Sequence, residues 1–148
     1  KNGEIWSIPA PREGISWEAL GFGLTTKDTM MAVATCTLDG AWKNYEIKKY
    51  GTLALEPAAT IINYGQGLFE GMKAYRTSSG SIVLFRPGAN AARCAAGAQR
   101  FLMPPIPADM FLEMCGGVVK ANADWVPPAG VGALYLRPVL FGSGASLG

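Results

Sequence analysis

The sequence contains no histidine among its 148 residues. This absence excludes a Ser-His-Asp or Cys-His catalytic group within the chain, and it excludes every metal site that depends on histidine ligands. The three cysteines, Cys36, Cys94 and Cys115, are odd in number and widely spaced. They predict neither a disulfide scaffold nor a zinc site, and they favour a reducing compartment. Chemistry here must use lysine, arginine, tyrosine, carboxylates or a cofactor.

Charge is also scarce. Charged residues make up 16% of the chain and hydrophobic residues 49%, whereas a typical domain is about 25% charged. We therefore expect apolar faces that meet another domain or subunit. The net charge of +2 comes from scattered residues and predicts no nucleic-acid partner. The apolar runs are shorter than the roughly 20 residues of a membrane helix, so no membrane association is predicted.

The two ends of the sequence suggest a piece of a larger protein. The chain starts at Lys1 and stops in a glycine-rich stretch, residues 142–148. We expect residues 1–23, which are rich in proline, glycine and tryptophan, to form an irregular arm. Residues 24–148 are expected to form one small domain, cut in a loop before a second domain.

Strand signals dominate the first half of the domain. Residues 30–37 and 42–50 predict a hairpin about Asp39-Gly40, and residues 53–64 predict a short strand and loop. A second hairpin is predicted over residues 72–75 and 81–85. Within it, Lys73 lies between apolar neighbours, which suits a desolvated nucleophile. Because strand residues alternate, we expect Met72 and Ala74 to face the core and Lys73 to face outward.

Helical periodicity follows. Residues 87–102 carry an apolar stripe of Ala91, Cys94, Ala95, Ala98 and Leu102, and a second helix opens at Asp109 with the stripe Phe111, Met114, Cys115 and Val118. Residues 134–141 predict a buried final strand. The predicted fold is α+β, a mostly antiparallel sheet with two main helices.

Several motifs leave two interpretations open. The glycines of Gly65-x-Gly67-x-x-x-Gly71 are misplaced for a dinucleotide fingerprint and suit turns and close packing. Arg93 lies opposite the apolar stripe of its helix. It is either a solvated surface residue or a residue that binds a phosphate group. Tyr135 and Arg137 share one side of a strand, and an arginine in an apolar run needs a carboxylate, either structural or from a substrate.

Four stretches together resemble the branched-chain amino acid aminotransferases, pyridoxal-phosphate enzymes of fold type IV, and most of all their plant-type members. The stretches are LGFGLTTKDTMM, INYGQGLFEGMKAYR, IVLFRPGANAARCAAGAQRFLMP and DWVPPAGVGALYLRPVLFGSGASLG. The resemblance runs from about Ser16 to the last residue in the family's order. It implies that this chain is nearly all of the smaller, N-terminal domain.

The resemblance also implies roles for individual residues. Arg93 matches the arginine that binds the phosphate of pyridoxal 5'-phosphate, whereas Arg86 matches a neighbour that does not. The matches to substrate-binding residues are Phe22, Tyr64, Phe69, Tyr135, Arg137 and Leu147. Aromatic walls suit a leucine, isoleucine or valine side chain, and the Tyr135–Arg137 pair suits the side-chain carboxylate of glutamate.

The rest of the family's machinery is not matched. The lysine that binds the cofactor covalently belongs to the other domain, so no catalytic residue is assigned here and we expect the chain alone to be inactive. The resemblance further implies amino-acid and 2-oxo-acid substrates, a homodimer of the full-length protein, and a plastid or a mitochondrion, with the cytoplasm as the alternative. Other hypotheses are a non-catalytic binding module and a relative that acts on D-amino acids or aminodeoxychorismate.

Overall fold

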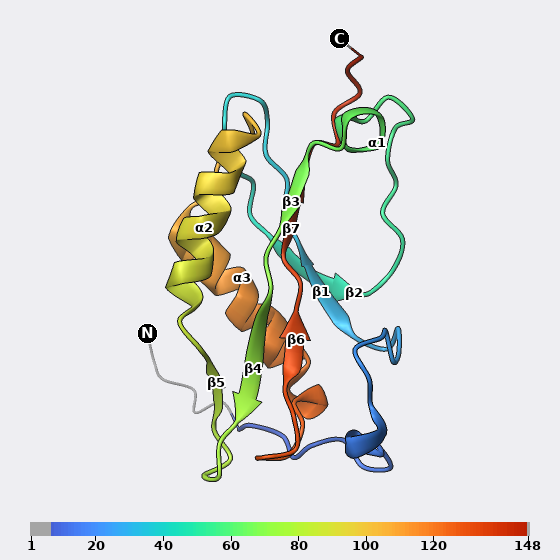
Figure 1. Cartoon of the computed structure of the whole chain (residues 1–148), viewed down its shortest axis with the longest axis vertical. Helices are drawn as coiled ribbons and strands as arrows, with labels where there is room; N and C mark the ends of the chain where they lie inside the picture. The colour runs from blue at the N-terminus through green and yellow to red at the C-terminus, as the bar shows by residue number, and fades with distance from the viewer. Residues whose placement is uncertain (1–6, 148) are drawn as a thin grey trace.

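The computed structural model describes residues 7–147, which form three small antiparallel sheets and two long helices (Figure 1). The elements in chain order are η1 (Trp17–Ala19), β1 (Met30–Val33), β2 (Glu46–Lys49), α1 (Thr60–Tyr64), β3 (Gly67–Phe69), β4 (Met72–Arg76), β5 (Ile82–Leu84), α2 (Pro87–Arg100), α3 (Ala108–Ala121), η2 (Ala123–Trp125), β6 (Leu134–Leu136) and β7 (Val139–Phe141). The predicted α+β class, with antiparallel strands and two main helices, is confirmed.

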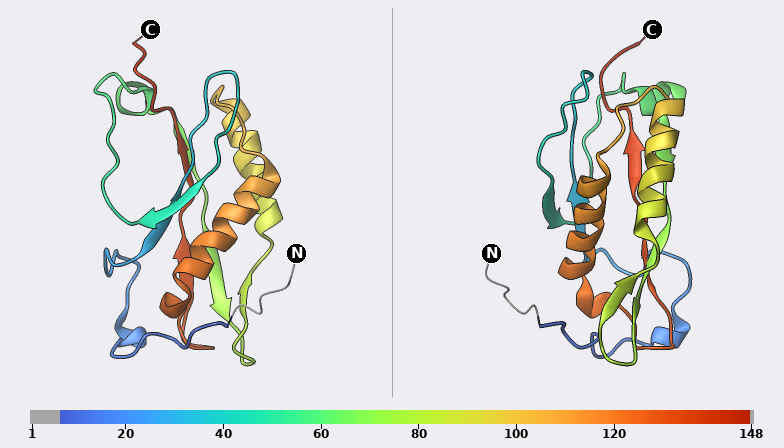
Figure 2. Two further views of the ribbon diagram at one scale, coloured as in Figure 1. Left: turned by 180° about the vertical axis from the view of Figure 1, so that it is seen from behind. Right: turned by 90° about the vertical axis from the view of Figure 1, so that its left-hand side faces the viewer.

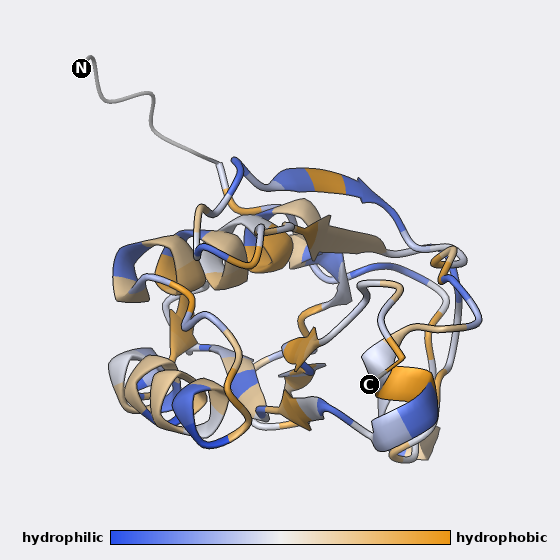
Figure 3. Ribbon diagram, turned by 90° about the horizontal axis from the view of Figure 1, so that it is seen from above, coloured by the Kyte–Doolittle hydropathy of each residue, from blue (hydrophilic) through white to orange (hydrophobic). Residues whose placement is uncertain are grey.

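The first hairpin forms as predicted. β1 and β2 pair antiparallel, with Met30 opposite Lys49, and a bridge between Cys36 and Trp42 extends the pairing toward the turn. Gly40 has a φ of 85°, which favours glycine at this turn. β1 packs against α3, and β2 lies on the outside of the molecule with hydrophilic ends (Figure 3).

β4 is the central strand of the sheet ordered β5-β4-β6. Its side chains alternate strictly, with Met72 and Ala74 buried and Lys73 exposed. The outward-facing interpretation of Lys73 is therefore confirmed, because an exposed amine is not desolvated by apolar neighbours. On the other face of this sheet, the two long helices pack against each other and cover the core (Figures 1 and 2).

The core contains part of each predicted helical stripe, and in α3 Val119 is buried where Val118 was predicted. Its buried members are Met72, Ala74, Ala91, Cys94, Phe111, Cys115, Val119 and Leu136. Leu102 was predicted in the stripe of α2, but the helix ends at Arg100 and Leu102 is 91% exposed. Its φ of 55° lies outside the helical region, so the side chain leaves the helical face.

Two predicted strands take other forms. In residues 53–64 the chain forms the short helix α1, which ends at Gly65 in a left-handed conformation with a φ of 64°. The Asn63 side chain donates to the carbonyls of Pro57 and Ala59 and stabilises this turn.

The predicted strand at 134–141 is two strands, because residues 137–138 separate β6 from β7. β6 pairs with β4 and β7 pairs with β3, in different sheets. Pro138 has no N–H to donate, and this interrupts the ladder, although its carbonyl accepts a 2.8 Å bond from the Glu70 amide.

No helix within residues 7–147 has both the length and the apolar composition needed to span a bilayer.

Two adjacent glycines inside α3 allow a matched test of helix packing. A Cβ on Gly116 would meet nothing within 4 Å, whereas a Cβ on Gly117 would lie 3.3 Å from Ile47 Cδ1. We expect Gly116→Ala to raise the free energy of unfolding by about 1 kcal/mol, because alanine has the higher helix propensity. Gly117→Ala should gain less, since the Ile47 side chain must move by a few tenths of an ångström. Urea denaturation of both variants tests this, and an equal gain would contradict the close approach of Ile47.

Candidate functional site

The junction between β3 and β4 presents neighbouring residues to opposite sides. Phe69 is 63% exposed, whereas Glu70 is only 4% exposed. Successive residues of an extended chain point to opposite faces, which explains the contrast. The junction thus has an inner side toward α2 and an outer side toward solvent.

On the inner side, Glu70 is held by two residues of α2. Arg93 Nε and Nη2 donate to the two carboxylate oxygens at 2.7 and 2.5 Å, and Asn90 Nδ2 donates to Glu70 Oε2 at 2.9 Å. Asn90 and Arg93 are three residues apart and therefore lie on one side of the helix. Asn90 Nδ2 also donates to the Gly71 carbonyl at 3.1 Å.

The ion pair is asymmetric in its exposure. The Glu70 side chain is 3% exposed and that of Arg93 is 70% exposed. Hydrogen bonds from Arg93 lower the pKa of the Glu70 carboxyl below its ordinary value, with a smaller contribution from Asn90, and they outweigh the opposite effect of burial. Glu70 therefore stays charged and orients a guanidinium that solvent reaches.

On the outer side, three side chains meet. Arg137 Nε and Nη2 donate to the Tyr135 hydroxyl oxygen at 3.2 and 3.1 Å. The Arg137 guanidinium lies over the Phe69 ring, 4.4 Å from its centroid. Gly71 makes this approach possible, because a Cβ at this position would overlap the Tyr135 hydroxyl. This explains one glycine of the motif as a close-packing residue.

A fourth residue reaches the same group from the N-terminal segment. The Phe22 ring contacts the Tyr135 ring edge-on, with centroids 5.0 Å apart and an interplanar angle of 63°. Three segments far apart in sequence thus bring together four of the residues expected at the substrate: Phe22, Phe69, Tyr135 and Arg137. We refer to these four residues as the aromatic–arginine cluster.

The remaining two expected residues lie elsewhere. Tyr64, at the end of α1, is 62% exposed and Leu147 is 66% exposed. Tyr64 and Ser146 line a surface pocket of about 390 Å³ together with Thr60, Gln66 and Phe101. Within residues 7–147, no hydrogen bond or ring contact joins Tyr64 or Leu147 to the aromatic–arginine cluster.

The apolar run around Arg137 predicted a buried arginine, and this prediction is wrong. It is exposed, and no carboxylate of the described residues 7–147 forms an ion pair with it. β6 ends at Leu136, so Arg137 lies in the break between β6 and β7 and not inside a buried strand. Its guanidinium and the O–H of Tyr135 can together donate to a carboxylate from outside this part of the chain.

Sequence reasoning missed Glu70 and Asn90. The strand alternation at residues 69 and 70 could have predicted the role of Glu70. If Phe69 points outward, Glu70 points inward, where a carboxylate needs a hydrogen-bond donor. The same geometry fits Arg93 to an anion. Its Nη1 has no partner among residues 7–147, so it can bind a phosphate while Nε and Nη2 stay on Glu70. No group of three or more metal-ligating side chains occurs in the described part of the chain.

Comparison with curated sequences gives clear relatives. The chain is 51% identical over 134 residues to the mitochondrial branched-chain-amino-acid aminotransferase 1 of Arabidopsis thaliana, an alignment that covers 90% of this chain and 35% of the relative. The chloroplastic branched-chain amino acid aminotransferase 2 of Humulus lupulus is 47% identical, with 90% and 33% covered. A methionine aminotransferase of Arabidopsis thaliana is 46% identical, with 90% and 38% covered. The chain thus spans about a third of the length of these relatives. No protein-family model matches it.

Solved structures support the fold. The branched-chain aminotransferase of Thermoproteus uzoniensis with norvaline superposes with a TM-score of 0.57 at 23% identity, covering 70% of this chain and 33% of that one. The Escherichia coli branched-chain amino acid aminotransferase gives 0.57 at 21% identity, with 82% and 36% covered. At this identity the likeness concerns the fold alone, and it matches the N-terminal domain of fold type IV enzymes.

The buried ion pair predicts a pH dependence of stability. Because the pKa of Glu70 is lowered in the folded chain, the charged carboxylate stabilises the fold above its unfolded pKa of about 4.3, and this contribution is lost as the pH falls through the folded value. We expect Glu70→Gln to lower the free energy of unfolding at pH 7 and to remove this acid-sensitive component. Glu113→Gln, an exposed change on α3, is the control. Urea titrations between pH 7 and pH 3 measure both, and parallel profiles for wild type and Glu70→Gln would contradict the role of the pair.

Proposed function

We propose that this chain, which is homologous over 90% of its length to the plant branched-chain-amino-acid aminotransferases, is the small domain of such an enzyme. In this proposal, residues 1–23 are an arm that contributes Phe22 to the substrate pocket, and residues 24–148 supply the rest of the pocket and part of the cofactor phosphate site. The reaction is transamination of leucine, isoleucine or valine with 2-oxoglutarate. The lysine that binds the cofactor is assigned to the remainder of the longer protein, and the chain alone is inactive.

One observation carries the proposal. The aromatic–arginine cluster combines apolar walls with hydrogen-bond donors that can bind a carboxylate in the same place. Phe22 and Phe69 offer exposed rings, with 79% and 63% of their surface accessible. Arg137 and the Tyr135 hydroxyl lie within 3.2 Å of each other and have unused donors. A transaminase for branched-chain substrates must accept an apolar side chain and a glutamate side chain in turn, and this cluster offers a surface for each.

The residues of the chain have distinct parts in the proposed reaction. The aromatic rings bury the apolar side chain and exclude water from it, and Tyr64 and Leu147 are assigned to the same pocket in the complete protein. Arg137 and Tyr135 orient glutamate through its second carboxylate. Arg93, held by Glu70, binds the phosphate of pyridoxal 5'-phosphate. When bound, that cofactor supplies the electron sink for transamination.

The exposed apolar surface supports a larger assembly. Phe85 and Val139 are 74% and 56% exposed. We assign these exposed apolar side chains to contacts with the rest of the longer protein in a homodimer. The relatives are named mitochondrial or chloroplastic, which supports a mitochondrial or plastid location. A methionine aminotransferase among them leaves methionine as a further possible substrate.

Replacing Arg137 in the longer protein tests the function. Arg137→Ala should lower kcat/KM for glutamate by about 10- to 100-fold, because a charge-assisted hydrogen bond contributes roughly 1.5–3 kcal/mol. The value for leucine should change little, since leucine has no second carboxylate. Steady-state assays with each amino acid provide the comparison, and equal losses for both substrates would assign Arg137 a structural role.

A pair of arginines tests the phosphate assignment. Arg93→Ala should weaken retention of pyridoxal 5'-phosphate by about 10- to 100-fold, because a charge-assisted contact is lost. Arg86→Ala, at the start of the same helix, should change stability but not retention. Absorbance of bound cofactor after dialysis reports retention independently of activity. The reverse order of effects would show that the two arginines have been assigned incorrectly.

A further inference from the structure

The segment from Arg12 to Asp28 is a closed loop. Arg12 Nη1 and Asp28 Oδ2 form an ion pair of 3.0 Å, although the residues are 16 positions apart. The short helix η1 lies within the loop. Loops of this length with joined ends are compact surface units. We refer to residues 12–28 as the N-terminal loop and to its joined ends as the neck.

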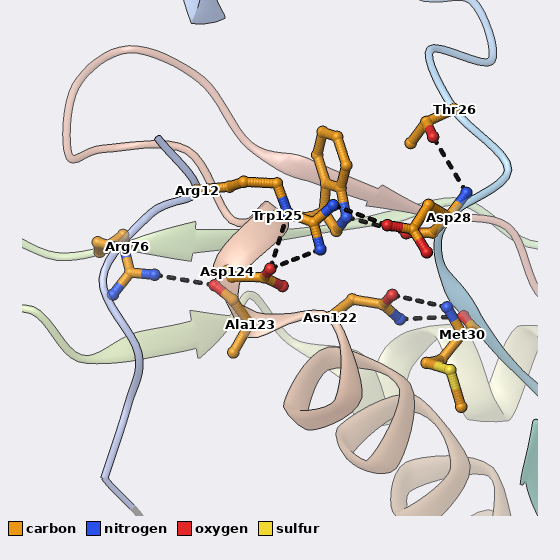
Figure 4. Close-up of polar contacts among 9 residues, drawn as sticks. All are labelled: Arg12, Thr26, Asp28, Met30, Arg76, Asn122, Ala123, Asp124 and Trp125. Atoms are coloured by element: carbon orange, nitrogen blue, oxygen red, sulfur yellow. Dashed lines mark hydrogen bonds and ion pairs between the residues drawn. The ribbon is translucent and has the colours of Figure 1, made fainter. Parts of the chain in front are cut away.

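The neck is bound to η2 by several contacts of Arg12 (Figure 4). Arg12 Nε and Nη2 contact Asp124 Oδ2 at 2.9 and 2.8 Å, and the Arg12 amide donates to the Asp124 carbonyl at 2.8 Å. The guanidinium lies 4.4 Å from the centroid of the Trp125 ring. Arg12 therefore joins both ends of the loop to one site on the domain.

The chain leaving the neck is anchored by buried side chains. Trp125 Nε1 donates to the Asp28 carbonyl at 3.1 Å. Asn122 binds both backbone groups of Met30, accepting from its amide at 2.8 Å and donating to its carbonyl at 3.0 Å (Figure 4). Asn122 and Trp125 are only 4% and 9% exposed. The platform under the neck is therefore part of the folded core region.

The tip of the loop has little support of its own. Residues 21–25 are all exposed, and a Cβ on Gly21 or Gly23 would meet nothing within 4 Å. Phe22 touches the domain through the ring of Tyr135. A cavity of about 240 Å³ lies beside the neck, lined by Arg12, Asp28, Asn122, Asp124 and Trp125 among others. The Trp17 ring also contacts the Trp125 ring edge-on, with centroids 6.1 Å apart, and the ion pairs of Arg12 join the two ends of the loop beside this contact.

From this arrangement we infer that Arg12 is a positioning residue for Phe22. The contacts of Arg12 with Asp28, Asp124 and Trp125 close the neck and so keep Phe22 on Tyr135, which pre-orders one wall of the side-chain pocket. Pre-ordering a loop removes the entropy loss that substrate binding would otherwise incur. The inference rests on the proposed function, which places Phe22 and Tyr135 at the substrate side chain.

The charges around the neck define the useful variants. Arg12 is the cation between two carboxylates, so its removal leaves Asp28 and Asp124 without this partner and loosens the neck, although the backbone bond to Asp124 and the Trp125–Asp28 bond remain. Lysine can pair with one carboxylate but cannot reproduce the forked contact, so Arg12→Lys should restore only part of the effect. Asp28→Asn removes the loop-closing ion pair while the contacts with Asp124 remain. Lys27→Ala, at an exposed neighbouring residue, is the matched control.

The experiment measures selectivity in the longer protein that carries this chain. Arg12→Ala should lower kcat/KM for leucine relative to alanine by roughly tenfold, because the lost wall contacts only the larger side chain. Phe22→Ala should have a similar effect, and the double variant should be no worse than Phe22→Ala alone. Arg12→Lys and Asp28→Asn should lie between wild type and Arg12→Ala. Retention of pyridoxal 5'-phosphate should be unchanged in all of them.

A second measurement follows the loop independently of activity. A glutamate-specific protease should cleave at Glu13 and Glu18 faster in Arg12→Ala than in Lys27→Ala, because both residues are already exposed and the loop backbone loses the contacts that restrain it. If Phe22→Ala alters selectivity but Arg12→Ala does not, the positioning role is overturned and the proposed function stands. The positioning role is also overturned if the effects of Arg12→Ala and Phe22→Ala on selectivity are fully additive in the double variant. It is overturned as well if Arg12→Ala lowers kcat/KM equally for leucine and alanine. If Phe22→Ala has no effect on selectivity, both the inference and the assignment of Phe22 to the pocket fail.

Discussion

The buried carboxylate of Glu70 is the constraint on which the rest of the site depends. A charge at 3% exposure requires partners, and Arg93 and Asn90 provide three hydrogen bonds to it. These bonds tie α2 to the β3–β4 junction and set the orientation of both. Because Phe69 and Gly71 are the immediate neighbours of Glu70, the same bonds determine where the outer side of the junction lies.

The inner and outer sides of the junction are thereby coupled. Arg93 faces solvent on the helix side, whereas Phe69 carries the Arg137 guanidinium on the other. The Tyr135 hydroxyl lies where a Cβ on Gly71 would be. In the proposed enzyme, one short backbone segment therefore holds Arg93, which binds the cofactor phosphate, through Glu70, and it also carries Phe69, which contacts the substrate. A shift of this segment would move both, which suits a reaction that requires their relative position to be preserved.

The N-terminal loop shows a different strategy for placing a side chain. Phe22 is 79% exposed, so burial cannot hold it in position. The loop is instead closed at its neck by ion pairs and by the Trp125 ring, all on a platform of buried side chains. Glu70 holds its partner from inside the core, whereas Arg12 holds the loop from partly exposed contacts.

The sequence by itself determined the features that depend on local periodicity and turn chemistry: the hairpin about Gly40, the buried stripe of Ala91, Cys94 and Ala98, and the outward orientation of Lys73. Its motifs also indicated the family to which the chain proved homologous. Only the tertiary structure decided that residues 134–141 divide between two sheets at Pro138, that Arg137 is exposed, and that Glu70 and Arg12 hold the site together. These features depend on contacts between residues far apart in the chain, such as Arg12 with Asp124 and Glu70 with Arg93. Periodicity indicates which face of an element a side chain occupies, but it does not indicate which distant residue that side chain contacts.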